Sequence, residues 1–198
     1  MINAGALTAT SLIRNSPSDS RFERIRRAYS QYAGRDLQLN EHVYTSESES
    51  GFRNRAIGYM LRTVDILEGD PDLVLEDYFK QCSIGVDCRD VAIMAATLAN
   101  GGVNPRTHRR LLGEPLVTQV LSVMTTCGMC DAAGDSVTAV GLPAKKWRSG
   151  RDYGGPARSD GACGLLAAVG FARQQRARRT GLRAALPRYG SAFHAGSA

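Results

Sequence analysis

The segment MAATLANGGVNP, residues 94–105, sets the local structure in the middle of this 198-residue chain. Its apolar residues recur at helical spacing, and we expect a helix that starts at Asp87 and stops at the Asn-Gly-Gly sequence of residues 100–102. The Asn-Pro pair at residues 104–105 then predicts a turn. The segment therefore predicts a helix that is followed by a sharp change of chain direction.

Helical patterns extend from this segment in both directions. Asp70, Pro71 and Asp72 form a strong helix start, because Asp caps a helix, proline suits its first position and an acidic side chain complements the dipole. Ser20 is the expected cap of an earlier helix, which ends near Gly34. The predicted helical segments are residues 4–13, 20–34, 51–69, 70–79, 87–100 and 116–128.

One short segment after these helices has the composition of a strand. Residues 136–142, SVTAVGL, contain β-branched side chains and are bounded by glycine and proline. Because a lone strand is not stable, a sheet that begins here needs further strands after it. The expected fold class is therefore α+β, with a mostly helical portion and an incomplete antiparallel sheet.

The positive charge of the chain lies in its last quarter. The net charge is +6, yet residues 1–145 carry 15 Lys and Arg against 17 Asp and Glu. Residues 146–198 carry 10 basic residues against two acidic ones, and Arg, Gly and Ala make up 29 of their 53 residues. We therefore expect a domain at 1–145 and a basic Arg/Gly/Ala-rich tail at 146–198. The basic run at residues 173–183 has no aromatic side chain to stack on bases, so nucleic-acid binding is not expected.

Other features of composition exclude whole classes of protein. No apolar run approaches the roughly 18 residues of a membrane span. The N-terminal sequence lacks the basic region of a signal peptide, so we expect a cytoplasmic protein. Five cysteines do not pair into a disulfide framework. Cys127 and Cys130 have the spacing of a redox pair or of half a zinc site, but no second pair of ligands has suitable spacing, so we expect no metal.

Five strings of residues together resemble one enzyme family, the serine-dependent glutaminases of the β-lactamase/transpeptidase-like superfamily. They are INAGA at 2–6, YFKQCS at 78–83, MAATLANGGVNP at 94–105, VMTTCGMCD at 123–131 and GLPAK at 141–145. The resemblance covers residues 1–145 and implies a β-lactamase/transpeptidase-like fold. It also implies an amidohydrolase that converts L-glutamine and water to L-glutamate and ammonia through a serine acyl-enzyme. No metal or organic cofactor is implied, and such enzymes are typically cytoplasmic homo-oligomers.

The same resemblance assigns four substrate-binding residues. Asn3 lies in the INAGA string, Glu47 precedes Asn54, and Tyr78 opens YFKQCS. Free glutamine is a zwitterion with a side-chain amide. A carboxylate such as that of Glu47 can pair with its ammonium group through charge-assisted hydrogen bonds. The Asn and Tyr side chains can hold its carboxylate and amide without adding a competing charge.

The chain departs from the family at its catalytic residues. The family's nucleophile and base form a Ser-x-x-Lys motif upstream of INAGA, and none of the three lysines, Lys80, Lys145 and Lys146, has a serine three residues before it. Cys130 stands where the family has an active-site tyrosine, and a thiol reaches less far and hydrogen-bonds less well than a phenol. We therefore expect an N-terminally truncated chain that has no catalytic pair and is inactive alone.

A second departure begins at residue 146. The family continues after PAK with S-G-V-x-G-G, whereas this chain continues with Lys-Trp-Arg. A one-base shift of the reading frame at Lys146 lets the same codons encode a sequence similar to the family's, so we expect an out-of-frame and poorly ordered tail. Two alternatives stay open. One is a non-catalytic fragment or binding module with a nucleic-acid-binding tail, and the other is a β-lactam-recognising relative.

Overall fold

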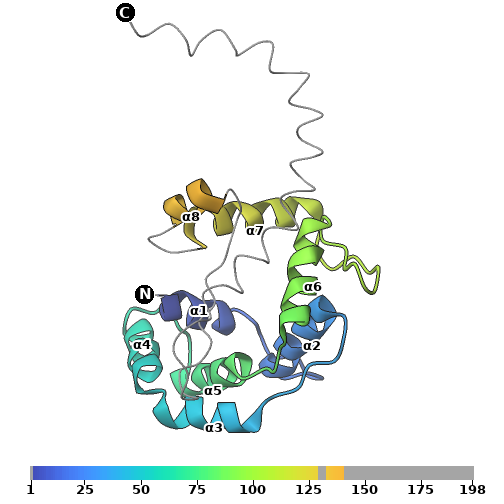
Figure 1. Cartoon of the computed structure of the whole chain (residues 1–198). Helices are drawn as coiled ribbons and strands as arrows, with labels where there is room; N and C mark the ends of the chain where they lie inside the picture. The colour runs from blue at the N-terminus through green and yellow to red at the C-terminus, as the bar shows by residue number, and fades with distance from the viewer. Residues whose placement is uncertain (1, 129–132, 141–198) are drawn as a thin grey trace, which may run out of the picture. The chain divides into compact units, whose positions relative to one another are not determined.

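The structure, a computed structural model, describes residues 2–128 and 133–140 of the chain (Figure 1). The chain divides after Asp87 into two compact units. The first contains α1 to α5 and the second contains α6 to α8. The helices are α1 (Ile2–Ser11), α2 (Arg21–Ala33), α3 (Glu41–Ser50), α4 (Phe52–Thr63), α5 (Pro71–Cys82), α6 (Cys88–Ala99), α7 (Glu114–Cys127) and α8 (Ala133–Val140).

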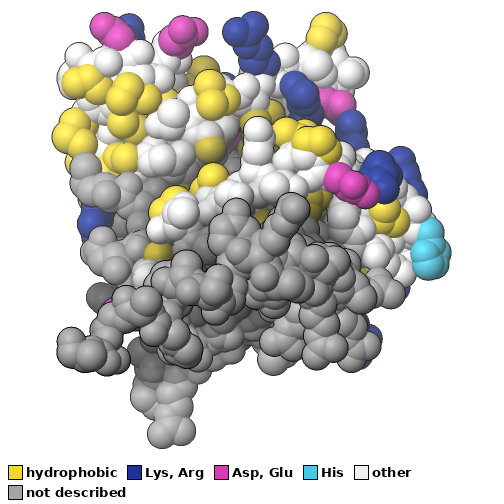
Figure 2. All heavy atoms as spheres, turned by 90° about the horizontal axis from the view of Figure 1, so that it is seen from above, with side chains coloured by type: hydrophobic (Ala, Val, Ile, Leu, Met, Phe, Trp, Pro, Cys, Tyr) yellow, Lys and Arg dark blue, Asp and Glu magenta, His cyan; other side chains and the backbone are white. Residues whose placement is uncertain are grey.

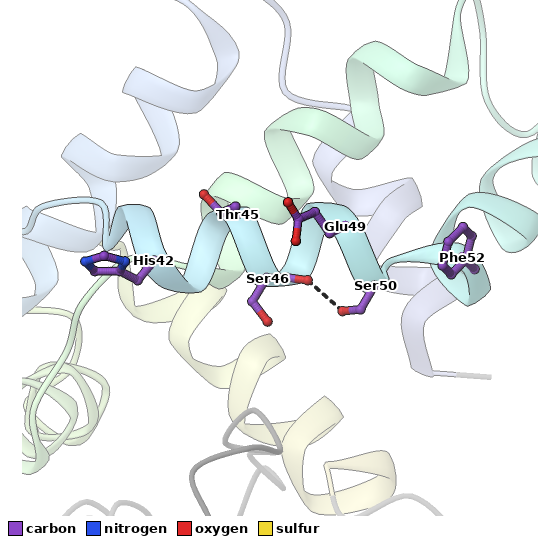
Figure 3. Close-up of a pocket in the computed structure, with 6 residues that line it drawn as sticks. All are labelled: His42, Thr45, Ser46, Glu49, Ser50 and Phe52. Atoms are coloured by element: carbon purple, nitrogen blue, oxygen red, sulfur yellow. Dashed lines mark hydrogen bonds between the residues drawn. The ribbon is translucent and has the colours of Figure 1, made fainter.

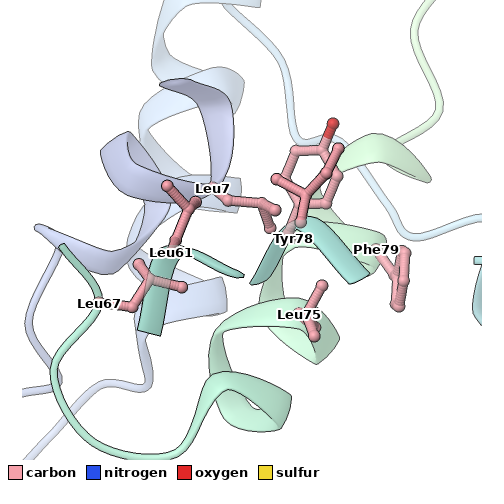
Figure 4. Close-up of a cluster of buried hydrophobic side chains, with 7 residues drawn as sticks. Leu7, Leu61, Leu67, Leu75, Tyr78 and Phe79 are labelled. Atoms are coloured by element: carbon pink, nitrogen blue, oxygen red, sulfur yellow. The ribbon is translucent and has the colours of Figure 1, made fainter. Parts of the chain in front are cut away.

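Helix α5 is the centre of the first unit, since α1, α2, α3 and α4 all pack against it. Its buried side chains include Val74, Leu75, Tyr78 and Phe79, which follow the helical repeat along one side. Leu75, Tyr78 and Phe79 join a core cluster that α1, α4 and the loop after α4 complete with Leu7, Ile57, Leu61 and Leu67 (Figure 4). Each such side chain stabilises the fold by about 1.5–3 kcal/mol through its burial.

The ends of α5 and α2 lie where the sequence predicts them. The carboxylate of Asp70 accepts a hydrogen bond from the backbone amide of Asp72 at 2.9 Å, and Pro71 occupies the first turn. The hydroxyl of Ser20 accepts from the amide of Glu23 at 3.2 Å. Gly34 closes α2 with a φ of 69°, in the left-handed region that glycine favours. These predictions are confirmed.

The second unit contains the segment of residues 94–105, and it too has the predicted structure. Helix α6 ends at a pair of glycines with positive φ, of which Gly102 has φ 87°. A β-carbon on Gly102 would overlap the carbonyl group of Leu112, so no other residue fits there. The side chain of buried Asn104 then accepts backbone hydrogen bonds from Arg106 at 2.8 Å and Thr107 at 3.0 Å, which closes the turn.

The prediction of a strand at residues 136–142 is wrong for the residues that the structure describes. Residues 133–140 form α8, which packs on α7. A strand needs a neighbour for its backbone groups, and the described residues contain only isolated β-bridges, such as Leu39 with Ile84. In a helix the same backbone groups bond locally. The described part of the chain is helical and contains no sheet, so the predicted α+β class is not confirmed there.

The structure differs from the predicted helices in two places. Helix α3 lies outside the predicted helical segments, because its apolar residues are few and none of its residues is buried. The helix predicted over residues 51–69 ends at Thr63 as α4, and of the apolar side chains in this range Ile57 and Leu61 lie in the core while Met60 and Val64 are exposed. Other large apolar side chains are exposed as well, and Figure 2 shows hydrophobic side chains among the charged ones on one face. No described helix is both long enough and apolar enough to span a bilayer.

Candidate active site

Each of the four predicted substrate-binding residues lies on a different helix of the first unit. Asn3 is on α1, Glu47 on α3, Asn54 on α4 and Tyr78 on α5. Helix α1 packs on both α4 and α5, and α3 packs on α5. The helices that carry these residues are therefore neighbours in space, although the residues span 75 positions of the sequence.

Asn3 and Asn54 are in direct contact. The side-chain nitrogen of Asn3 donates a hydrogen bond to the side-chain oxygen of Asn54 at 2.6 Å, across 51 positions of sequence. The bond leaves the oxygen of Asn3 as an acceptor and the nitrogen of Asn54 as a donor, and both side chains are only partly buried. A ligand that carries both a donor and an acceptor, such as a primary amide, matches this pair.

Tyr78 and Glu47 are close enough to interact electrostatically. Burial raises the pKa of Tyr78 far above its usual value, and the neighbouring Cys82 and the negative charge of Glu47 raise it further. Tyr78 is therefore a neutral hydrogen-bonding group at every physiological pH. Cys82 lies one turn along α5, and although much of the residue is exposed, desolvation of its thiol raises the pKa of Cys82 too. The only negative charge in this group is that of Glu47.

A close approach at Gly51 fixes the spacing of Glu47 and Asn54. Gly51 joins α3 to α4, and a β-carbon on it would lie 2.7 Å from the backbone oxygen of Glu47 and 2.8 Å from Cε1 of Phe79. The guanidinium carbon of Arg55 lies 5.4 Å from the centre of the Phe79 ring, on whose face it stacks. The ring is thereby held against Gly51, and the two site residues lie on either side of this contact.

A groove lies on the outer side of α3, and it contains none of the four predicted residues (Figure 3). Its volume is about 550 Å³, and its walls are His42, Thr45, Ser46, Glu49, Ser50 and Phe52. All six side chains are exposed, and they come from one face of α3 and the first residue of α4. The hydroxyl of Ser50 is already used, since it donates to the backbone oxygen of Ser46 at 2.6 Å. Among the residues that the structure describes, every lining side chain therefore comes from this one side of the groove.

The catalytic groups of the resembled family are not among the described residues. Lys80 is the one lysine in the described part of the chain. Its ammonium group donates to Glu76 on the same helix at 2.5 Å and lies 5.8 Å from the centre of the Tyr44 ring. Cys130 lies outside the described residues. Within residues 2–128 and 133–140, no cluster of His, Cys, Asp or Glu is arranged to hold a metal ion.

Comparison with known proteins identifies the family. The family model for glutaminase matches residues 1–151, about three quarters of the chain. The chain belongs to the glutaminase family.

Individual glutaminases show how much of such a protein is present here. Glutaminase 1 of Bradyrhizobium diazoefficiens is 49% identical over 145 residues, which are 73% of this chain and 24% of that protein. A glutaminase of Clostridium botulinum is 42% identical over 146 residues, 48% of its length. The chain spans about a quarter of the first of these relatives and about half of the second.

Solved glutaminase structures match the same fraction of the chain. The crystal structure of a probable glutaminase from Bacillus subtilis has a TM-score of 0.68 at 33% identity, over 73% of this chain and 46% of that one. Mglu in its glutamate form has a TM-score of 0.67 at 40% identity, over 74% and 34%. The described helices therefore correspond to part of the β-lactamase-like glutaminase fold.

Proposed function

We propose that the first unit of this chain provides the glutamine-recognition surface of a glutaminase, which hydrolyses L-glutamine to L-glutamate and ammonia. The observation that carries the proposal is the 2.6 Å bond between Asn3 and Asn54, with Glu47 and Tyr78 within electrostatic reach of each other on the adjacent α3 and α5. The four residues that we propose for a free amino-acid site therefore lie on one packed group of helices.

The chemistry of these groups suits a zwitterion with an amide side chain. Glu47 supplies a negative charge for the ammonium group of the substrate, and a charge-assisted bond of this kind is about twice as strong as a neutral one. Tyr78 supplies a hydroxyl that stays neutral because its pKa is raised. The free acceptor of Asn3 and the free donor of Asn54 suit the substrate's amide or carboxylate.

Two solved relatives support a ligand of this class. One is Mglu in its glutamate form. The other is a Bacillus subtilis glutaminase in covalent complex with 5-oxo-L-norleucine, formed from 6-diazo-5-oxo-L-norleucine, with a TM-score of 0.67 at 33% identity. Both ligands have the carbon chain of an amino acid of glutamine's size. We propose the same class of ligand for this chain.

We further propose that the 198-residue chain binds glutamine without hydrolysing it. Formation of an acyl-enzyme needs a nucleophile and a base, and the sequence contains no Ser-x-x-Lys. Loss of both groups lowers the rate by many orders of magnitude, because they act as a unit. A glutaminase assay on the purified chain should therefore release no ammonia above the background without protein, and release of ammonia would overturn this part of the proposal.

A matched pair of variants on α3 tests the binding site. Glu47→Gln removes the charge proposed to bind the ammonium group, and we expect the dissociation constant for L-glutamine, measured by calorimetry or NMR titration, to rise about tenfold. Glu49→Gln removes an equal charge from the exposed groove face of the same helix, and it should change the constant less than twofold. Equal effects of the two substitutions would refute the assignment of Glu47.

The organisation of the whole protein is also a proposal. We propose a glutaminase part that ends near residue 145, an out-of-frame tail from Lys146, and a cytoplasmic, homo-oligomeric intact relative. The loss of acidic residues after 145 and the end of the family match at 151 support the boundary. Sequencing the DNA around codon 146 tests the frame, and an intact frame there would exclude the shift.

A further inference from the structure

A partly buried hydrogen-bond network is centred on Gln81 of α5. The side-chain oxygen of Gln81 accepts from the hydroxyl of Thr10 on α1 at 3.0 Å, and this hydroxyl shares its one hydrogen with the backbone oxygen of Ala6, also at 3.0 Å. Its nitrogen donates to the hydroxyl of Tyr29 on α2, also at 3.0 Å. Thr10 is only 2% exposed, and burial raises the pKa of Tyr29, so water competes little for these bonds. One side chain therefore ties three helices together.

The residues of the network lie on the same sides of α5 and α1 as the proposed site residues. Gln81 lies three residues after Tyr78, so both side chains project from the same side of α5. Thr10 lies seven residues after Asn3, two turns along α1, and therefore on the same side as Asn3. The bond between Thr10 and Gln81 thus joins the two helices that carry Asn3 and Tyr78.

Apolar packing alone does not fix the position of α1 along α5. Leu7 is the α1 side chain in the core cluster, with Ala4 and Ala6 packed against it. Apolar contacts of this kind are non-directional, and a small shift of the helix changes them little. A hydrogen bond, by contrast, weakens steeply with distance and angle. The bond between Thr10 and Gln81 is therefore a directional contact between α1 and α5, in addition to the bond between Asn3 and Asn54.

We propose that Gln81 is a positioning residue for glutamine binding: through Thr10 it fixes α1 on α5, and so it places Asn3 against Asn54. The bond to Tyr29 has a different part, since it joins α5 to α2, a helix that carries none of the four proposed site residues. This inference rests on the proposed function, because the pair of Asn side chains matters only if it contacts the ligand.

Two variants that each remove one bond of the network separate positioning from stability. Thr10→Val and Tyr29→Phe are nearly isosteric, and we expect similar losses of stability in thermal unfolding. Only Thr10→Val should shift the side-chain amide NMR signals of Asn3 and Asn54, and it should weaken glutamine binding about fivefold. Tyr29→Phe keeps the bond between Thr10 and Gln81, and it should change binding less than twofold.

Further variants complete the test. Thr10→Ser keeps the hydroxyl and should restore both amide signals and the affinity. Gln81→Met, which breaks the same bond from the α5 side, must shift the same signals and replaces Thr10→Val if that variant does not fold. Unmoved signals in these variants, or a Ser variant as weak as Val, would overturn the inference. If the unsubstituted chain binds no glutamine, the proposed function fails, whereas the amide signals of the ligand-free protein still decide the role of Gln81.

Discussion

Replacement of Gly51 by alanine tests whether the junction of α3 and α4 is as tight as the structure shows. Gly51 has φ −72° and ψ 19°, a conformation that alanine adopts without strain, so the effect of Gly51→Ala is purely steric. The new β-carbon would lie 2.8 Å from Cε1 of Phe79 and 2.7 Å from the backbone oxygen of Glu47. Carbon atoms pack best at about 3.5–4.0 Å, so the junction must open by roughly 1 Å.

The size of the effect follows from where Phe79 lies. Phe79 is 1% exposed and sits in the core of the first unit, so its ring has no free space to enter. Overpacking of this kind costs about 1–3 kcal/mol. The loss of glycine's freedom in the unfolded chain offsets about 0.4–1 kcal/mol of this cost. We therefore expect Gly51→Ala to lower the free energy of unfolding by about 1–2 kcal/mol.

A second glycine in the same unit is the matched control. A β-carbon on Gly5 of α1 would meet no atom within 4 Å, so Gly5→Ala should raise stability by about 0.5–1 kcal/mol. Urea unfolding of the full chain, followed by circular dichroism, measures both. Gly51→Ala should also weaken glutamine binding, because Glu47 and Asn54 lie on either side of the junction. If Gly51→Ala stabilises the chain as much as Gly5→Ala does, the steric argument is wrong.

Three further predictions concern other parts of the structure. The pKa of Tyr78 is raised in the folded state, so its phenol contributes fully to the free energy of unfolding below pH 10.0, the usual pKa of tyrosine. This contribution declines as pH rises above that value. Tyr78→Phe should therefore reduce the fall of melting temperature between pH 10 and 12. Gly102→Ala should lower the free energy of unfolding by more than about 2 kcal/mol, because φ is 87° and the new β-carbon would overlap the Leu112 carbonyl group. It should also speed hydrogen exchange of the Leu112 amide, which donates to the backbone oxygen of Gly102. Asp77→Asn should lower the free energy of unfolding in urea by about 1–2 kcal/mol, because it weakens a 2.8 Å ion pair with Arg21 in which each side chain is less than a fifth exposed. An unchanged midpoint of urea unfolding would show that water replaces the ion pair.

The sequence allows prediction of those elements whose signals are local. The start of α5 depends on Asp70 and Pro71, which act within one turn, and this start is where it was expected. Helix α3 has few apolar residues and no buried one, so it is stabilised by its Asn40 cap and by packing on α5, which no short window of sequence reveals. At residues 136–142 the β-branched pattern competes with helix formation, and local bonding prevails in α8.

The candidate site follows the same division. The resemblance to a family supplies Asn3 and Asn54 as site residues, but their contact links positions that are 51 residues apart and depends on how α1 packs on α4. Gln81, which we propose as a positioning residue, was not predicted from the sequence. Its signal was present in the YFKQCS string, where it lies one helical turn after Tyr78 and so shares its face of α5.

If Asn3 and Asn54 contact the ligand as proposed, the bond between them also affects how a ligand is selected. In the ligand-free protein the two amides hold each other in place, so their rotamers are already restricted before a ligand arrives. Ordering of a flexible side chain at an interface costs about 0.5–1.5 kcal/mol, and this cost is largely absent for both residues. Because the amides act as one unit that keeps N–H donors of both residues and the acceptor oxygen of Asn3, a ligand that offers only one kind of partner leaves the other kind unmatched. In the proposed site, this pattern of hydrogen bonds would select a ligand together with the charge of Glu47.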